Sequence, residues 1–252
     1  MKLCRFDLAS SPGTARTGIV YEGKVYETEG ANPIGVHDWT EARLLSPVGQ
    51  PPSFRLFPTL PADGLSEAFD FRYLNPNAIA GPLGVIAVSP GMELSCIPCL
   101  GAVVAGGGAS IPIAQADEVL LGLTLVNVFY QSSEKSLNEL PPWAFDAGTA
   151  VGPALTTPDE LDENVIDVAN GRSYDFEIAL SLNDDVIFKK NVEQMGATIA
   201  QLLSFASLTC PLKQGDLFAA GLLREVPDVR LKSGDQVRLV SEKLGALVTK
   251  LA

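Results

Sequence analysis

An uncharged stretch at residues 94–116 constrains the fold of this chain more than any other feature of its sequence. A helix of roughly 20 apolar residues can span a bilayer. This stretch contains Pro98, Pro112 and the glycine triplet 106–108, and a lone helix in lipid cannot satisfy the backbone groups that so many breaks expose. The sequence therefore predicts two buried strands joined by a turn, and no transmembrane helix.

The rest of the chain also favours strands. Its apolar runs are short and are separated by Gly, Pro and Asp, a pattern typical of strands joined by turns. Residues 18–27, with Gly23 in the middle, predict a hairpin. Only two segments are typical of helices: a short one opening at Gln115, and residues 192–208, whose apolar residues recur with helical spacing. We predict a mostly β protein with few helices (α+β). The predicted strands lie at 83–88, 99–105, 119–128, 151–156, 176–182, 186–188 and within 215–250.

Prolines divide the chain into two parts. Residues 50–62 hold four prolines, which forbid long regular elements there. We predict a small N-terminal β-rich domain with its linker at residues 1–62 and a core domain at residues 63–252. A chain of 252 residues is long enough for one large domain with a small appendage.

The charge of the chain excludes several partners. Lys and Arg number 18 against 30 Asp and Glu, which gives a formal charge of −12. A protein this acidic, without a basic run, has no electrostatic means of holding a nucleic acid or an anionic membrane surface. The N-terminal residues lack the apolar core of a secretory signal, so we expect a cytoplasmic protein whose partner is a small molecule.

The cysteines and the single histidine support no metal site. In a reducing compartment the four cysteines are expected to be thiols. On one strand, Cys96 and Cys99 would face opposite sides about 10 Å apart, beyond the ~7 Å that a disulfide tolerates. A structural role is the first interpretation of this pair, and a redox role or one catalytic thiol are the alternatives. We expect His37 to be a packed or solvated loop residue rather than a base.

Four segments share their motifs and their order with a known family. They are GLTLVN at 122–127, WAFDAGTAVGPALTTPDEL at 143–161, KQGDLFAAG at 213–221 and LKSGDQVRLVSEKLG at 231–245. They are similar to the family segments GYTVANDVSARD, SFDTF…GPWLVTPDEI, EPGDVIATGTP and LKPGDVVEVEIEGLG. The chain thus resembles the fumarylacetoacetate hydrolase superfamily, which implies that superfamily's β-rich fold for the core domain.

The same resemblance places unusual residues at the family's metal site. Members hold Mg²⁺ or Mn²⁺ with an E-x-E pair on a strand and a later aspartate. Here Ile97 and Cys99 fall at the two glutamates, and Asn127 falls at the aspartate. An apolar side chain, a soft thiol and an uncharged amide are poor ligands for a hard cation. We therefore expect a divergent member without the metal carboxylates, and no other cofactor.

Other family positions have changed as well. By resemblance, Trp143 replaces a lysine of the family and Ile79 replaces its lid histidine. Residues 221–224 occupy the position of its TGTP motif. Together with Ile97 and Leu222, these replacements predict an apolar lining, as ligand pockets commonly have.

A few polar residues remain as candidates for chemistry. Asn127 is predicted to hydrogen-bond a ligand carbonyl or to satisfy neighbouring backbone groups, while Tyr130 and Gln131 are predicted to face the pocket. Trp143 is either a pocket wall or a core residue, and Asp146 is a pocket residue or a turn former. The candidate catalytic residues are Asn127, Tyr130 and Gln131, and the candidate substrate-binding residues are Arg72, Tyr73, Ile97, Cys99, Trp143 and Asp146.

Two classes of function follow. The first is a metal-independent enzyme that cyclises, isomerises or cleaves a β-dicarbonyl or polyketide-like compound, because holding a reactive chain in place can supply about 7–11 kcal/mol. The alternative is a non-catalytic protein that binds a small molecule or stabilises a partner. The resemblance also implies a homodimer, and we expect the apolar Leu120 and Phe129 to contribute to its interface.

Overall fold

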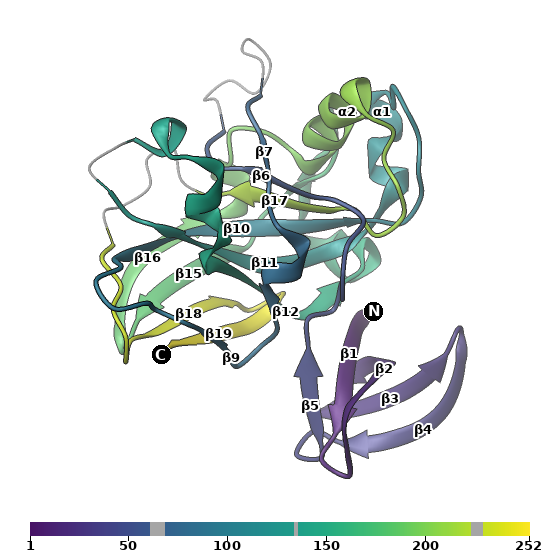
Figure 1. Ribbon diagram of the computed structural model, residues 1–252. Helices are drawn as coiled ribbons and strands as arrows, with labels where there is room; N and C mark the ends of the chain where they lie inside the picture. Colours follow the sequence, from purple (N-terminus) through teal and green to yellow (C-terminus); the bar gives the residue numbers. More distant parts are fainter. Residues whose placement is uncertain (61–68, 134–135, 223–228) are drawn as a thin grey trace.

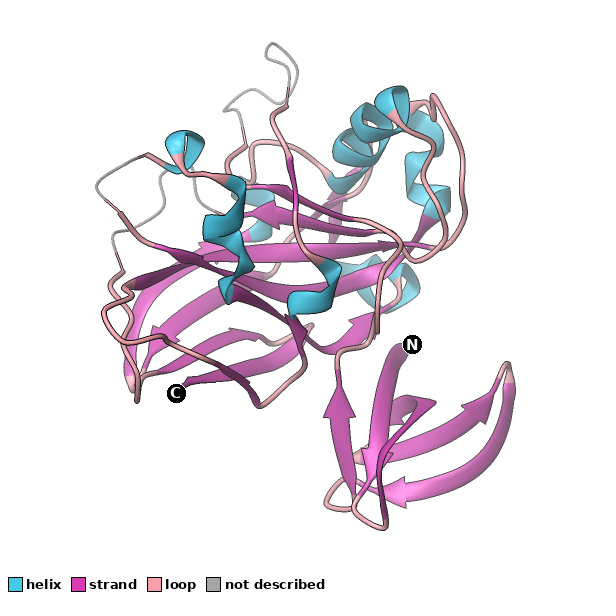
Figure 2. Cartoon of the chain, viewed as in Figure 1, coloured by secondary structure: helices cyan, strands magenta, loops and turns pink. Residues whose placement is uncertain are grey.

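The protein is built mostly of strands, which confirms the predicted fold class (Figure 2). The structure, a computed structural model, describes residues 1–60, 69–133, 136–222 and 229–252. Strands form two large sheets and one small ribbon, with two α-helices and several 3₁₀ turns between them. No helix within the described ranges is long and apolar enough to cross a membrane.

Five strands near the N-terminus lie together at one end of the molecule (Figure 1). The β2–β3 hairpin closes on Glu22 and Gly23, both with positive φ, so that Tyr21 pairs with Lys24. The hairpin predicted for residues 18–27 is therefore confirmed. These strands are β1 (Lys2–Leu8), β2 (Ser11–Tyr21), β3 (Lys24–Glu29), β4 (Asn32–Asp38) and β5 (Ala42–Leu45).

The largest sheet continues from these strands into the body of the molecule. Its main path runs β4-β3-β2-β1-β12-β11-β10-β17-β6-β7, with β5 and β8 attached to its sides. The step between the two parts is the antiparallel pairing of β1 with β12, where Lys2 lies opposite Thr156. The further strands are β6 (Phe54–Phe57), β7 (Arg72–Tyr73), β8 (Ile79–Ala80), β10 (Leu94–Val104), β11 (Leu120–Gln131), β12 (Gly148–Thr156) and β17 (Leu217–Gly221).

A second sheet packs against the first. Its order is β16-β15-β18-β19-β9, and β13 (Val165–Asp167) pairs with β14 (Ser173–Tyr174) in a separate ribbon. The strands of the second sheet are β9 (Gly84–Ile86), β15 (Glu177–Leu182), β16 (Asp185–Asn191), β18 (Gln236–Ser241) and β19 (Gly245–Leu251).

The predicted domain boundary near residue 62 falls within 61–68, outside the described residues. Before it, β6 pairs with β17 in the body of the large sheet. The division into residues 1–62 and 63–252 stays a prediction.

The helices differ in part from the predicted ones. The α2 helix (Ile199–Thr209) begins seven residues later than predicted, because Thr198 and Gln201 form a capping box that starts it there. Only the 3₁₀ turn η6 (Val192–Gln194) occupies the first part of the predicted helix. The short helix expected near Gln115 is α1 (Ile113–Ala116), followed by η2 (Asp117–Val119).

Within residues 94–116 only the first predicted strand is correct. It is β10, which is buried along its whole length. The second predicted strand is wrong, because the chain after Val104 passes through the glycine triplet and Pro112 into α1, and the next strand begins at Leu120. The remaining 3₁₀ turns are η1 (Pro76–Ala78), η3 (Leu137–Glu139), η4 (Pro142–Ala147) and η5 (Pro158–Asn164).

Strands β10 and β11 have an apolar cluster on each face. One face packs against the second sheet and α2; we call this the sandwich cluster, and it includes Cys96, Leu100 and Phe129. The other face packs against η4 and nearby turns; we call this the outer cluster, and it includes Ile97, Cys99 and Phe145. Leu120 and Phe129 are both buried in the sandwich cluster, so the expectation that they contribute to a dimer interface is wrong.

Candidate functional site

The register of β10 and β11 fixes which side chains face the outer cluster. Side chains alternate along a strand, so Ile97 and Cys99 share one face of β10, and both are fully buried there. The residue directly opposite Ile97 on β11 is Val128. The two positions that the resemblance relates to the metal-binding glutamates thus lie together inside the outer cluster.

Asn127 does not join them. It lies opposite Pro98 in the register, and its side chain is on the sandwich face, where it hydrogen-bonds the Cys96 thiol. Its Oδ1 atom has no hydrogen-bond partner among the described residues. The prediction that Asn127 faces a pocket with Ile97 and Cys99 is wrong, because a shift of one residue moves a strand side chain to the opposite face. Val128 holds that position instead.

The residues on this face do not fit a Mg²⁺ or Mn²⁺ ion. Ile97 and Val128 have no donor atom, and burial raises the pKa of the Cys99 thiol well above its usual 9.0, so the thiolate that would bind a metal is disfavoured. Hard divalent cations need several oxygen ligands. Across the described parts of the chain, no group of three or more His, Cys, Asp and Glu side chains is placed to hold a metal.

Polar groups gather at one end of the outer cluster. Tyr130 stacks on Phe145, with ring centres 5.7 Å apart. The Arg72 guanidinium lies 5.1 Å from the centre of the same ring, and it donates a hydrogen bond of 3.1 Å to the Leu140 carbonyl oxygen. We call Arg72, Tyr130 and Phe145 the arginine–aromatic group. In this group Arg72, a predicted substrate-binding residue, and Tyr130, a predicted catalytic residue, both contact the Phe145 ring.

Ser95 lies beside the arginine–aromatic group, and sequence reasoning missed it. It lies directly opposite Tyr130 in the register of the two strands. Its side chain is buried, and its hydroxyl has no partner among the described residues. The signal that could have identified it is strand alternation, because Ser95 is two residues before Ile97.

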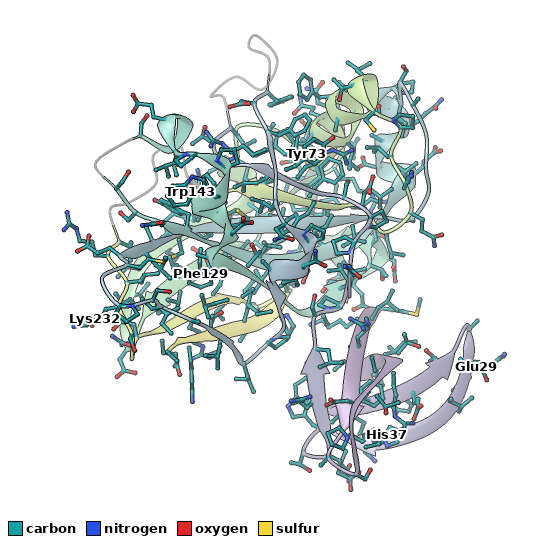
Figure 3. All side chains as sticks on the ribbon, in the orientation of Figure 1. Glu29, His37, Tyr73, Phe129, Trp143 and Lys232 are labelled. Atoms are coloured by element: carbon teal, nitrogen blue, oxygen red, sulfur yellow. The ribbon has the colours of Figure 1, made fainter. Side chains whose placement is uncertain are left out.

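Other predicted site residues lie elsewhere. Gln131 follows Tyr130 on β11 and so points to the opposite face. Trp143 is 62% exposed and lies at the periphery (Figure 3), so it is neither a pocket wall nor a core residue. Asp146, on the same 3₁₀ turn, is also exposed. The Tyr73 ring is exposed and packs on the Arg55 guanidinium, 5.4 Å away.

The predicted apolar lining is only partly assembled. Ile79 packs against the outer cluster from β8, whereas Leu222 is buried in the sandwich cluster on the other face. Residues 223–224 of the lost TGTP motif lie outside the described residues.

His37 is packed, as predicted, but on strand β4 rather than in a loop. Its Nε2 atom lies 2.7 Å from Glu27 Oε2, and its ring lies 5.6 Å from that of Phe6. The hydrogen bond to His37 and a second one to Arg16 lower the pKa of the Glu27 carboxyl. Figure 3 places His37 among the N-terminal strands, away from the outer cluster.

Three of the cavities lined by described residues lie on the sheets and beside α2. A groove of about 570 Å³ lies over β15, β16 and β18, an apolar hollow of about 290 Å³ lies over β2 and β3, and a cavity of about 120 Å³ lies beside the start of α2. None of these three is lined by a predicted site residue.

Comparison with known proteins identifies the class to which this fold and site belong. Residues 64–252 match the family described as fumarylacetoacetate (FAA) hydrolase C-terminal. The match covers most of the chain, and the chain belongs to this family.

Curated relatives are distant. The chain is 29% identical over 164 residues to the uncharacterized protein SH1982 of Staphylococcus haemolyticus, covering 61% of this chain and 50% of that protein. It is 26% identical over 185 residues to the mitochondrial oxaloacetate tautomerase FAHD2A of Bos taurus, covering 69% of this chain and 56% of that protein. The chain thus spans about half the length of these relatives.

Solved structures share the fold over the whole chain. The 5-carboxymethyl-2-hydroxymuconate delta-isomerase of Mycobacterium smegmatis has a TM-score of 0.83 at 20% identity, with 100% of this chain and 99% of that chain covered. The maleylpyruvate hydrolase of Sphingobium sp. SYK-6 has a TM-score of 0.79 at 20% identity with the same coverage, and it was also solved with manganese (II) ion and pyruvate. At this identity the likeness establishes the fold alone.

Proposed function

We propose that this protein is a divergent fumarylacetoacetate hydrolase family enzyme that acts without a divalent metal. Its substrate is a small β-dicarbonyl or polyketide-like compound, and its reaction is an isomerisation, a cyclisation or a carbon–carbon cleavage. The observation that carries the proposal is the set Ile97, Cys99 and Val128, which offers no oxygen ligand on the face where the resemblance expects the metal.

The arginine–aromatic group supplies the polar contacts of the proposed site. The Arg72 guanidinium is always charged and can donate to an oxygen that gains negative charge when a carbonyl compound enolises. The Tyr130 hydroxyl can donate or accept one hydrogen bond. Both side chains border the apolar outer cluster, which excludes water and strengthens such contacts.

The names of relatives fit this class of chemistry. They include an oxaloacetate tautomerase and a 5-carboxymethyl-2-hydroxymuconate delta-isomerase, and both names describe isomerisation. Oxaloacetate is itself a β-dicarbonyl compound, so its keto–enol interconversion is the first reaction to test.

The test follows oxaloacetate interconversion by ultraviolet absorbance, with the wild-type protein and excess EDTA. The proposal predicts acceleration that EDTA does not change. Arg72→Lys should lower kcat roughly tenfold, since a charge-assisted hydrogen bond to the oxygen that gains charge is worth about 1.5–3 kcal/mol in the transition state. Tyr73→Phe, which changes an exposed hydroxyl near the same segment, is the matched control and should behave as wild type. Activity that disappears in EDTA and returns with Mn²⁺ would refute the proposal.

A non-catalytic role is the second candidate. It is favoured by the complete burial of Ile97 and Cys99, which leaves these side chains no contact with a substrate unless the outer cluster opens. In that case the protein would bind a small molecule or stabilise a partner. Saturable binding of oxaloacetate or a related oxo acid without turnover would support this role.

Two further features of the proposal concern the whole protein. We propose a homodimer, by analogy with the family, and a cytoplasmic location. All four cysteines are free thiols, which suits a reducing compartment.

A further inference from the structure

The N-terminal strands have one covered face and one exposed apolar face. The covered face holds Val25, which is fully buried and packs with Phe6. Because side chains alternate along a strand, Tyr26 points to the other face. The register places Ile19 opposite Tyr26 and Tyr26 opposite Val36. A row of three apolar side chains therefore crosses β2, β3 and β4 on the exposed face, at the end of the molecule where these strands lie (Figure 1).

This face contains a hollow with a projecting side chain beside it. The hollow has a volume of about 290 Å³, and its lining is mostly apolar. Val36 is 55% exposed and lies next to the hollow on β4, at the edge of the large sheet. Tyr21, in the lining, is 60% exposed. Contiguous exposed apolar surface of this kind marks an interaction site. The residues that line the hollow are Ile19, Tyr21, Tyr26, Thr28, Ala31 and Pro33.

The charge of this face fits a second copy of the chain. Each chain carries a formal charge of −12, so two copies repel each other over most of their surfaces. The register of the exposed face places Lys24 opposite Asp38, and these two charges cancel. The residues that line the hollow are all uncharged. Two copies can therefore meet at this face with little repulsion.

The shape of the face is complementary to itself. Because Val36 and the hollow lie side by side, a two-fold axis can place the Val36 side chain of each copy against the hollow of the other. A fully covered aromatic side chain buries about 150–250 Å², so Tyr21, Val36 and the partly exposed residues around them offer roughly 500 Å² per copy. Two copies then bury about 1,000 Å², the lower limit for a specific interface.

We propose that this face joins two copies of the chain. The proposal rests on the homodimer proposed above, and it names the interface of that dimer. Val36 of each copy packs into the hollow of the other, beside Tyr21 and Tyr26. An interface of this size is typical of weak, reversible association, so the dimer dissociates on dilution.

Sedimentation velocity of the full chain at micromolar concentrations tests this interface. Val36→Asp brings a charge to the hollow, and the two-fold symmetry applies the cost twice. Ala31→Leu fills the hollow. The matched control is Val186→Asp, because Val186 is 65% exposed on β16, the edge strand of the second sheet. Circular dichroism checks that each variant is folded.

We expect the wild type and Val186→Asp to form the same dimer. Val36→Asp should raise the dissociation constant of the dimer at least about tenfold, because a charge is buried without a partner, and Ala31→Leu should raise it as well. A dimer that both variants leave unchanged would overturn this interface but not the homodimer. A wild type that stays monomeric at every concentration would overturn both.

Discussion

Asp216 and Arg55 form a buried ion pair whose disruption should be costly. Their side chains are each 2% exposed, and Arg55 Nη1 lies 3.4 Å from Asp216 Oδ2. Asp216 also accepts hydrogen bonds from the Ser53 hydroxyl at 2.8 Å and from the Lys213 backbone at 2.9 Å. This pair joins β6 to the turn that precedes β17.

The Arg55 guanidinium is buried and has aromatic rings around it. The Cζ atom of Arg55 lies 5.2 Å from the ring centre of Phe218 and 6.0 Å from that of Phe71. Asp216→Asn removes the only carboxylate that pairs with it among the described residues. Removing one partner of a buried pair costs about 3–5 kcal/mol, because the other charge stays buried without compensation. A typical domain is stable by about 5–15 kcal/mol, so the loss should be large.

Urea denaturation followed by circular dichroism measures this loss. The matched control is Glu177→Gln, which breaks the exposed pair with Lys189 and should cost no more than about 1 kcal/mol. Adding Arg55→Met to Asp216→Asn should recover much of the stability, since no charge is then left unpaired. A loss below about 1 kcal/mol for Asp216→Asn alone would show that the reasoning about this pair is wrong.

Three further predictions concern the whole protein. Hydrogen bonds from Arg43 and a backbone amide lower the pKa of Asp7 below its usual 3.8. The contribution of Asp7 to stability is therefore present above that pH and is lost as the pH falls through the lowered pKa. Urea unfolding at pH 7 and pH 3 should show that Arg43→Ala loses less free energy of unfolding on acidification than the wild type does. Cys210 is exposed and the other three cysteines are buried, so a thiol reagent should modify one thiol in the native protein and four after denaturation; a second fast thiol in the native protein would contradict this. Light scattering at micromolar concentration should give about twice the chain mass of 26.6 kDa, whereas a monomer mass would remove the dimer.

The sequence predicted the strands well where the apolar runs were bounded by turn residues. The β2–β3 hairpin and the strands after residue 176 are examples, because glycine, asparagine or aspartate occupies the turns at 22–23, 183–184 and 215–216. The late start of α2 was also readable, since Thr198 and Gln201 have the spacing of a capping box. The apolar periodicity that continues through Gly196 hid this signal.

The site was harder to predict, for a physical reason. Strand β11 is buried on both faces and is almost entirely apolar, so it has no alternation of polar and apolar residues to show which face each side chain occupies. The prediction placed Asn127 at the family's aspartate, one residue too early. The motif itself could have corrected this, because GLTLVN at 122–127 matches GYTVAN and leaves Val128 at the aspartate. The exposure of Trp143 depends on how η4 packs against the sheet, and no local sequence pattern predicts that packing.

Elemental analysis of the purified, dialysed protein tests the central claim most directly. The account predicts far less than one Mg, Mn or other divalent metal per chain, and no change in the melting temperature when Mn²⁺ is added, because Ile97, Cys99 and Val128 cannot replace the water lost by a hard cation. A family member known to bind manganese serves as the positive control. About one Mg²⁺ or Mn²⁺ per chain that survives dialysis, or marked stabilisation by added Mn²⁺, would contradict the account.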